Sequence, residues 1–209
     1  GQSWTDEDGR PEASDLYVHA DGTIFLTVQN LDFRGVEPIA PQTSQLIHFQ
    51  ANGDIIDRYS IPANPFAPIV ARDDDHLLIA CNDSWAIEDH AGLWQFNINN
   101  QAQELLINEQ QLNGNILHFI YHDGLIYILI SQLDFSTALY RFNPTTKAIT
   151  TMTGSTSSIG CIAEVGNNTI YLCDRTIGNH GIRQLDIENQ QVKASLFKTT
   201  LSPLQILYH

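Results

Sequence analysis

Four segments of the sequence carry the polar and aromatic side chains that could do chemistry, and each lies between two apolar runs. The segments are 30–44, 82–92, 131–138 and 174–181. In the second, Trp85 could stack on a sugar or an apolar side chain while neighbouring carboxylates bind polar groups. Alternatively, Trp85 folds back onto its own strands. The candidate binding residues of these segments are Asp83, Trp85, Glu88, His90, Asp134, Asp174, Arg175 and His180.

Three of these carboxylates could also support catalysis. Asp83, Asp134 and Asp174 could serve a lyase or a glycoside hydrolase if two or three of them converge within about 6–9 Å. The sequence lacks the familiar local signatures G-x-S-x-G, H-E-x-x-H, the Walker loop and G-x-G-x-x-G. We therefore assign no catalytic residue, and the sequence favours a binding protein over an enzyme.

The cysteines allow one cross-strand pair. Cys161 and Cys173 are placed symmetrically about Asn167, which lies in a predicted turn. Directly opposed residues on adjacent antiparallel strands can have Cα atoms about 4.5 Å apart, at the short end of the disulfide range. A disulfide would indicate an oxidising compartment. The alternative, which we favour slightly, is that both are buried free thiols.

Metal ligation has little support in the sequence. His118 and His122 are four residues apart on a predicted strand and the turn that follows it, a separation of about 13 Å in extended chain that is too long for one shared ion. The acidic segment 5–15 lacks the glycine spacing of an EF-hand loop. No C-x-x-C motif occurs. We predict no cofactor, although an acidic loop or channel could hold a cation such as calcium.

Composition excludes some classes of partner. The chain has 24 Asp+Glu against 10 Lys+Arg, a formal charge of -14, which repels the phosphates of nucleic acids. No apolar run approaches the roughly 20 residues of a membrane-spanning helix. With 43% hydrophobic residues, the 209-residue chain can build a substantial core.

The strands that position the four segments repeat along the chain. The run "LYRFNPTTKAITTM" at 139–152 has three relatives, and their apolar positions align without gaps. One aligned column holds Leu46, Leu93, Leu139 and Ile182, with spacings of 47, 46 and 43 residues. Repeats of this period in all-β sequences are typical of β-propellers.

A second hairpin precedes each copy of the run. Asp21-Gly22 and Asp123-Gly124 are strong hairpin turns, because both residues tolerate positive φ. Each module therefore contains four strands, which for the third module we predict at 116–121, 125–131, 138–143 and 148–153. A β-sandwich is the rival fold, but it gives no reason for a four-stranded unit to recur.

The modules also resemble known propeller blades. The fourth, "GNNTIYLCDRTIGNHGIRQLDIENQQV", resembles an NHL-type blade. "LYRFNPTTKAIT" is similar to blades of bacterial extracytoplasmic propellers of the quinoprotein-like and seven-bladed surface-repeat type. The resemblance implies the fold. With the acidity of the chain, it favours a periplasmic or surface location over a cytoplasmic one.

These observations predict an all-β chain with an acidic flexible segment at 1–14 and one β-propeller domain at 15–209. The predicted modules are 15–64, 65–114, 115–160 and 161–203, followed by the first strand of a fifth at 204–209. The chain could be part of a larger ring, which we favour. It could instead form a four-bladed ring, or share one ring with a second copy, so the oligomeric state stays open.

The leading functional hypothesis is a non-catalytic scaffold that binds a protein or glycan through its rim loops. The first alternative is the propeller enzyme described above. The second is a structural subunit of a larger assembly, which a large apolar rim patch would indicate.

Overall fold

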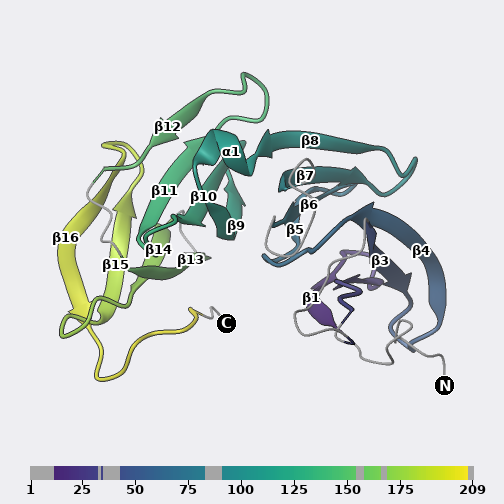
Figure 1. Cartoon of the computed structure of the whole chain (residues 1–209), viewed down its shortest axis with the longest axis horizontal. Helices are drawn as coiled ribbons and strands as arrows, with labels where there is room; N and C mark the ends of the chain where they lie inside the picture. Colours follow the sequence, from purple (N-terminus) through teal and green to yellow (C-terminus); the bar gives the residue numbers. More distant parts are fainter. Residues whose placement is uncertain are drawn as a thin grey trace. The chain divides into compact units, whose positions relative to one another are not determined.

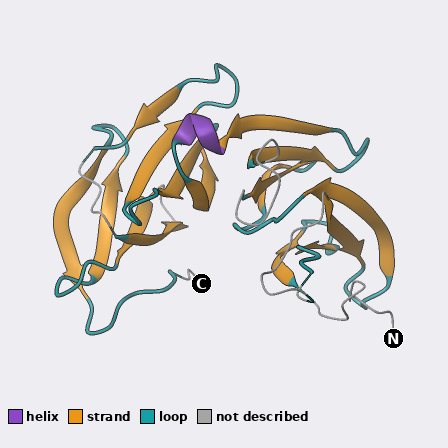
Figure 2. Ribbon diagram, in the orientation of Figure 1, coloured by secondary structure: helices purple, strands orange, loops and turns teal. Residues whose placement is uncertain are grey.

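The structure is a computed structural model that describes residues 12–32, 34, 43–82, 91–153, 158–165 and 169–206. Figure 2 shows that the described residues are almost entirely strands and loops, with one short helix. The strands form separate four-stranded antiparallel sheets, each in sequential order. We call them blades 1 to 4, and they correspond to the four predicted modules.

The strand bounds follow the chain. Blade 1 holds β1 (Ala13–Val18), β2 (Ile24–Val28), β3 (Thr43–Phe49) and β4 (Ile55–Pro62). Blade 2 holds β5 (Val70–Asp73), β6 (His76–Cys81), β7 (Gly92–Asn97) and β8 (Gln103–Asn108), and is followed by α1 (Glu109–Leu112). Blade 3 holds β9 (Asn115–His122), β10 (Leu125–Ser131), β11 (Thr137–Phe142) and β12 (Ile149–Thr151). Blade 4 holds β13 (Ile159–Val165), β14 (Thr169–Asp174), β15 (Gly181–Asp186) and β16 (Gln191–Lys198).

Blade 3 confirms the sequence-based strand assignment to within two residues at each end. Its first turn has Asp123 and Gly124 at φ values of 48° and 77°, the positive values that an Asp-Gly hairpin turn needs. Strand β10 is buried on both faces, because Ile126–Ile130 are all inaccessible to solvent. A strand that is apolar at every position suits a sheet covered on both sides.

The chain divides into two compact units, Gly1–Gln111 and Leu112–His209, which Figure 1 colours from purple to teal and from teal to yellow. In the first unit, side chains of blades 1 and 2 share a core that includes Phe25, Leu46, Leu77 and Phe96. In the second, blades 3 and 4 share a core that includes Leu139 and Leu172. Each unit thus has a hydrophobic core of its own.

The start of blade 1 departs slightly from the prediction. Strand β1 begins at Ala13, inside the segment 1–14 that we expected to be flexible. The pairing extends this far because Ser14 and Thr27 share a hydroxyl hydrogen bond of 2.8 Å, and the Gln29 amide donates to the Glu12 carbonyl at 3.0 Å. Residues 1–11 lie outside the described residues.

The C-terminal segment also departs from the prediction. We expected a strand at 204–209, but residues 204–206 make no strand pairing, and 207–209 lie outside the described residues. The segment is instead held by Arg175, whose Nε donates to the Pro203 carbonyl at 3.1 Å. The missing pairing leaves four blades as the strand content of the described chain.

Candidate functional site

Each of the four candidate segments connects the second strand of its blade to the third. In a four-stranded antiparallel meander, the connection from the second strand to the third leaves the sheet at the same edge as the connection to the next sheet. We call this edge the rim. Asp83, Trp85, Glu88 and His90 fall in 83–90, outside the described residues, so their predicted role stays a prediction.

The β10–β11 loop, residues 132–136, is tightly closed by hydrogen bonds. The Gln132 amide donates to the Ser136 carbonyl at 2.8 Å, and the Phe135 amide donates to the Gln132 carbonyl at 3.0 Å. The Ser136 amide and hydroxyl both donate to Asp134 Oδ1, at 3.0 and 2.6 Å. These bonds lower the pKa of Asp134 below its ordinary value. This predicted binding residue therefore shapes its own loop.

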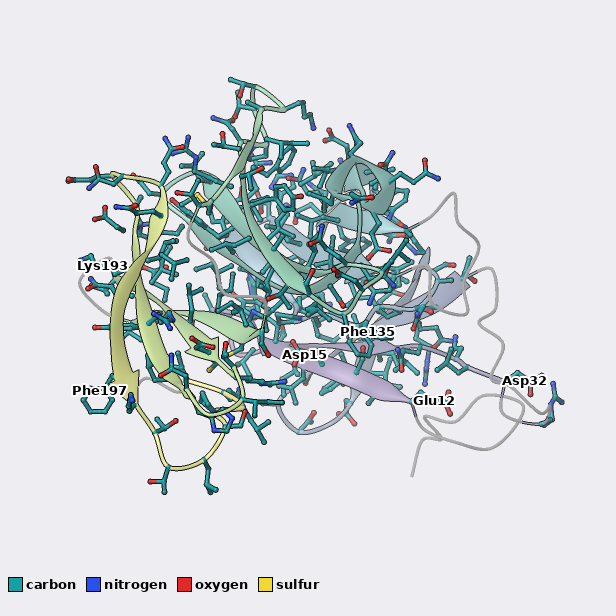
Figure 3. The ribbon with its side chains drawn as sticks, turned by 60° about the vertical axis from the view of Figure 1, so that its left-hand side comes forward. Glu12, Asp15, Asp32, Phe135, Lys193 and Phe197 are labelled. Carbon is teal, nitrogen blue, oxygen red and sulfur yellow. The ribbon has the colours of Figure 1, made fainter. Side chains whose placement is uncertain are left out.

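The same loop presents two apolar side chains to solvent. Leu133 is 95% exposed and Phe135 is 88% exposed. Phe135 also has φ of 62°, in the left-handed region that costs a non-glycine residue about 1–2 kcal/mol. Figure 3 labels Phe135. A strained backbone that holds an aromatic side chain in water is a feature that folding alone does not explain.

Strand β14 ends at Asp174, which is fully buried and directly precedes the β14–β15 loop. Its Oδ1 accepts from the Thr176 amide at 2.9 Å and hydroxyl at 2.6 Å, as Asp134 does from Ser136. Its Oδ2 forms a 2.6 Å ion pair with Arg183 Nε. Burial alone would raise the pKa of Asp174, but the hydrogen bonds from Thr176 and Arg183 outweigh it, so the net pKa is lowered. Asp174 is thus positioned as a structural anchor, and its proposed binding and catalytic roles stay predictions.

The remaining predicted residues of this loop are half-buried. Besides Pro203, Arg175 binds the Leu204 carbonyl through Nη2 at 3.4 Å. The His180 carbonyl accepts from the Thr199 amide at 3.1 Å. Both residues therefore hold the segment that follows β16. Between them, Ile177 is 95% exposed.

The two loops adjoin through Ile159, the first residue of β13. Its amide donates to Thr137 Oγ1 at 2.8 Å, at the base of the β10–β11 loop. Ile159 also pairs with Asp174, at the base of the β14–β15 loop. The segment after β16 joins them through Arg175 and exposes Leu201 and Leu204 by 80% and 73%.

We call the exposed apolar side chains of these three segments the apolar rim. They are Leu133, Phe135, Ile177, Leu201 and Leu204. None of the five was predicted as a binding residue, because an apolar side chain in a loop carries no sign in the sequence of whether it is buried or exposed. The available signal was an apolar residue at a turn position, in "LDFS" and "RTIG".

The cysteines have the predicted register. Residues 162 and 165 of β13 pair with 172 and 169 of β14, the predicted register, and Cys161 and Cys173 follow directly after the Ile162–Leu172 pair, where β13 becomes irregular. Both are buried free thiols in this structure, as is Cys81. The thiols of Cys161 and Cys173 share a hydrogen bond. The disulfide itself stays a prediction.

Two histidines of β9 lie at the boundary between blades 3 and 4. His122 Nδ1 lies 3.1 Å from Glu164 Oε1 on β13. His118 sits opposite Leu129, with its Nδ1 buried and without a hydrogen-bond partner among the described residues. Burial lowers the pKa of His118 to about 4. Among the residues that the structure describes, no three His, Cys, Asp or Glu side chains cluster as metal ligands.

Blade 1 carries a polar depression of about 210 Å³ at the rim ends of β2, β3 and β4. Its lining residues are Asn30, Thr43, Ser44, Gln45, Arg58, Tyr59 and Ser60. Arg58 Nη1 donates to Gln45 Oε1 at 3.1 Å, and Ser44 Oγ donates to the Gln29 carbonyl at 2.7 Å. Arg58 and Gln45 are therefore bonded to each other, and Ser44 is bonded to the backbone that follows β2.

No helix in the described part of the chain is long and apolar enough to cross a membrane. No protein-family model matches the sequence, and no curated protein matches it significantly. Solved structures do resemble it. The Dos1 propeller is similar, with a TM-score of 0.60 at 13% identity over 90% of this chain and 48% of its own.

Two further neighbours are informative. One is the extracellular domain of a putative hybrid two-component system of B. thetaiotaomicron, with a TM-score of 0.57, 11% identity, and coverage of 92% of this chain and 22% of that one. The other is a chain in the crystal structure of a nidogen/laminin complex, with a TM-score of 0.55, 11% identity, and coverage of 89% and 80%. The chain thus has a β-propeller fold, as the sequence predicted, and spans less than half the length of the first two of these three neighbours.

Proposed function

We propose that this β-propeller protein binds a partner protein through its apolar rim. The observation that carries the proposal is the exposure of Leu133, Phe135 and Ile177 on two adjoining loops, each shaped by the same Asp-x-Ser/Thr hydrogen bonds. Exposed apolar clusters on folded domains commonly mark interaction sites. Aromatic side chains near the centre of such sites often dominate the binding energy.

The chemistry of the rim favours a protein over a glycan. Four of its five side chains are aliphatic, and they offer neither the flat aromatic platform nor the polar groups that sugar recognition uses. The loops are closed by internal hydrogen bonds, so little conformational entropy is lost when a partner binds. The nidogen/laminin neighbour supports the proposal to the extent that its structure contains a protein complex.

The partner surface should combine apolar side chains with basic ones. The chain carries a formal charge of -14, and opposite charge on a partner accelerates association and aligns the surfaces. We also propose a location outside the cytoplasm. The blade resemblance to bacterial extracytoplasmic propellers and the likeness to the extracellular domain of a putative hybrid two-component system support that location.

Site-specific photo-crosslinking tests this function. Phe135, Ile177 and, as a control, Ile56 on β4 are each replaced by p-benzoylphenylalanine in cells that produce the protein. Ile56 is also exposed, by 46%, but belongs to no rim loop. We expect positions 135 and 177 to cross-link to the same protein and position 56 not to do so. Equal cross-linking from all three positions, or none from 135 and 177, would overturn the proposal.

A further inference from the structure

Cys161 and Cys173 differ chemically although they face each other. Strand β13 has a register irregularity between Ile159 and Ile162, which interrupts regular pairing at Cys161. Cys173 is fully buried and Cys161 is 5% exposed. The two cysteines lie on neighbouring strands, one residue before Ile162 and one after its partner Leu172, so a bond between their sulfurs needs no change of strand pairing.

The surroundings favour a thiolate at Cys161. The hydrogen bond from Cys173 is the main cause that lowers the pKa of Cys161; burial opposes it, and the Ile206 amide and the positive charge of Arg175 assist it. The same hydrogen bond and burial raise the pKa of Cys173. Thiolates are the nucleophilic form of cysteine, so Cys161 is the more reactive partner.

Cys81 provides an internal contrast. It is also fully buried, and its thiol donates to the Pro62 carbonyl at 3.4 Å. Burial raises its pKa, and the charge of Glu109 adds to the effect. A thiol in such surroundings is unreactive, so burial alone does not account for the lowered pKa of Cys161.

Segment 203–206 lies beside Cys161. The Arg175 guanidinium lies against Gly160, where a Cβ atom would overlap it, and it binds the carbonyls of Pro203 and Leu204. The Ile206 amide lies within hydrogen-bonding range of the Cys161 sulfur. Leu204 points into solvent, so polar contacts rather than buried apolar area hold this segment.

We propose that Cys161 and Cys173 form a redox-active pair that a hydroperoxide oxidises to a disulfide, and that oxidation loosens segment 203–206. The Cys161 thiolate attacks the peroxide, so an S–O bond forms, the O–O bond breaks, and an alcohol or water leaves after taking a proton. Cys173 then attacks the Cys161 sulfenic acid, which forms the S–S bond and releases water with the Cys173 proton. The net change is two thiols and one hydroperoxide to one disulfide, one alcohol or water, and one water.

The loosening follows from the change at sulfur. The lowered pKa gives the Cys161 sulfur more negative charge than an ordinary thiol, so it accepts from the Ile206 amide and attracts Arg175 more strongly than a neutral disulfide sulfur does. The contacts of segment 203–206 with this sulfur therefore weaken when the bridge forms. The reactivity of the pair does not depend on a partner bound at the apolar rim.

Treatment of the full chain with one equivalent of hydrogen peroxide tests the pair. Peptide mapping should show a Cys161–Cys173 bridge with a mass loss of about 2 Da and an unmodified Cys81. In Cys173→Ser, Cys161 should accumulate a sulfenic acid that dimedone traps. In Cys161→Ser, Cys173 should react about tenfold more slowly, at the rate of Cys81. Cys81→Ser should behave like the wild type.

Hydrogen exchange at the Ile206 amide provides a second readout. It should accelerate after oxidation of the wild type and stay unchanged in peroxide-treated Cys161→Ser. Three free thiols after treatment of the folded protein, or faster reaction of Cys173 than of Cys161 in the single variants, would overturn the reactive pair. Unchanged exchange at Ile206 in the bridged protein would overturn the coupling to the segment.

Discussion

At the scale of single residues, burial determines which carboxylates are accessible to solvent and which are held in internal contacts. Asp134 and Asp174 make the same hydrogen bonds to a Ser or Thr two residues later. Only Asp174 is buried and paired with Arg183. A sequence pattern shows the shared turn chemistry but not the difference in solvent access, so the two residues looked equivalent before the structure was known.

Asp174→Ala should lower the free energy of unfolding by about 3 kcal/mol, because it removes the carboxylate from the buried Arg183 guanidinium. Asp134→Ala removes the matching turn bonds at an exposed site and should cost much less. Urea denaturation of the two variants measures the difference. An equal decrease in the free energy of unfolding of the two variants would show that Asp174 stabilises the protein through its turn hydrogen bonds and not through the ion pair.

His118 should make stability depend on pH. Its folded pKa of about 4 lies below the 6.5 of an unperturbed histidine, so between these pH values the unfolded chain binds a proton that the folded chain does not. The His118 contribution is complete above pH 6.5 and is lost as the pH falls toward 4. Between these pH values, the free energy of unfolding that His118 contributes changes by about 3 kcal/mol.

His118→Leu should flatten the stability curve between pH 6.5 and 4 in urea denaturation. His19→Gln is the matched control, because the hydrogen bond from His19 to Asp21 raises the pKa of His19. Its contribution is present at low pH and is lost as the pH rises past the folded pKa, the opposite sign. A pH profile that His118→Leu leaves unchanged would contradict the assignment.

At the scale of elements, the β10–β11 loop holds Phe135 exposed to solvent on a strained backbone that lowers the stability of the loop. Phe135→Gly removes the Cβ from a left-handed backbone without losing buried area, so the free energy of unfolding should stay the same or rise by about 1 kcal/mol. The same change should weaken partner binding. The amount of the partner protein, once cross-linking has identified it, that co-purifies with the variant measures this loss.

Phe197→Gly provides the comparison for that loop. Phe197 projects from β16 and is also mostly exposed, but it is paired with Ile182 in a strand, where glycine is unfavourable (Figure 3). This variant should be destabilised and should keep partner binding. If Phe135→Gly is the less stable of the two, the backbone of the loop is not strained as we describe.

The strands were predictable from sequence and the site largely was not. Aligned apolar columns such as Leu46, Leu93 and Leu139 determine where strands lie, because each must be buried in its own sheet. The apolar rim is defined by the solvent exposure of loop side chains. The hydrophobic periodicity of the sequence predicts exposure only within strands. Residues 204–206 look like a strand, yet strand formation also needs a neighbouring edge with which to pair.

At the scale of the whole molecule, each compact unit contains its own core. A core substitution should therefore destabilise mainly the unit that carries it. Leu172→Ala opens a cavity in the core of blades 3 and 4, and Leu77→Ala does so in the core of blades 1 and 2, each at about 2–5 kcal/mol. Amide hydrogen exchange should accelerate first in the unit that carries the substitution. Equal acceleration in both units would show that they open together.

The central claim is that two loops of adjacent blades form one binding surface for a protein. The most direct measurement is the cross-linking yield from position 135 in a chain that also carries Ile177→Asp, compared with a chain that carries Ile56→Asp. A charge placed within a shared apolar interface should cost more than about 1 kcal/mol of binding, so Ile177→Asp should reduce the yield about fivefold or more. Ile56→Asp should leave it unchanged. An undiminished yield with Ile177→Asp would contradict the claim.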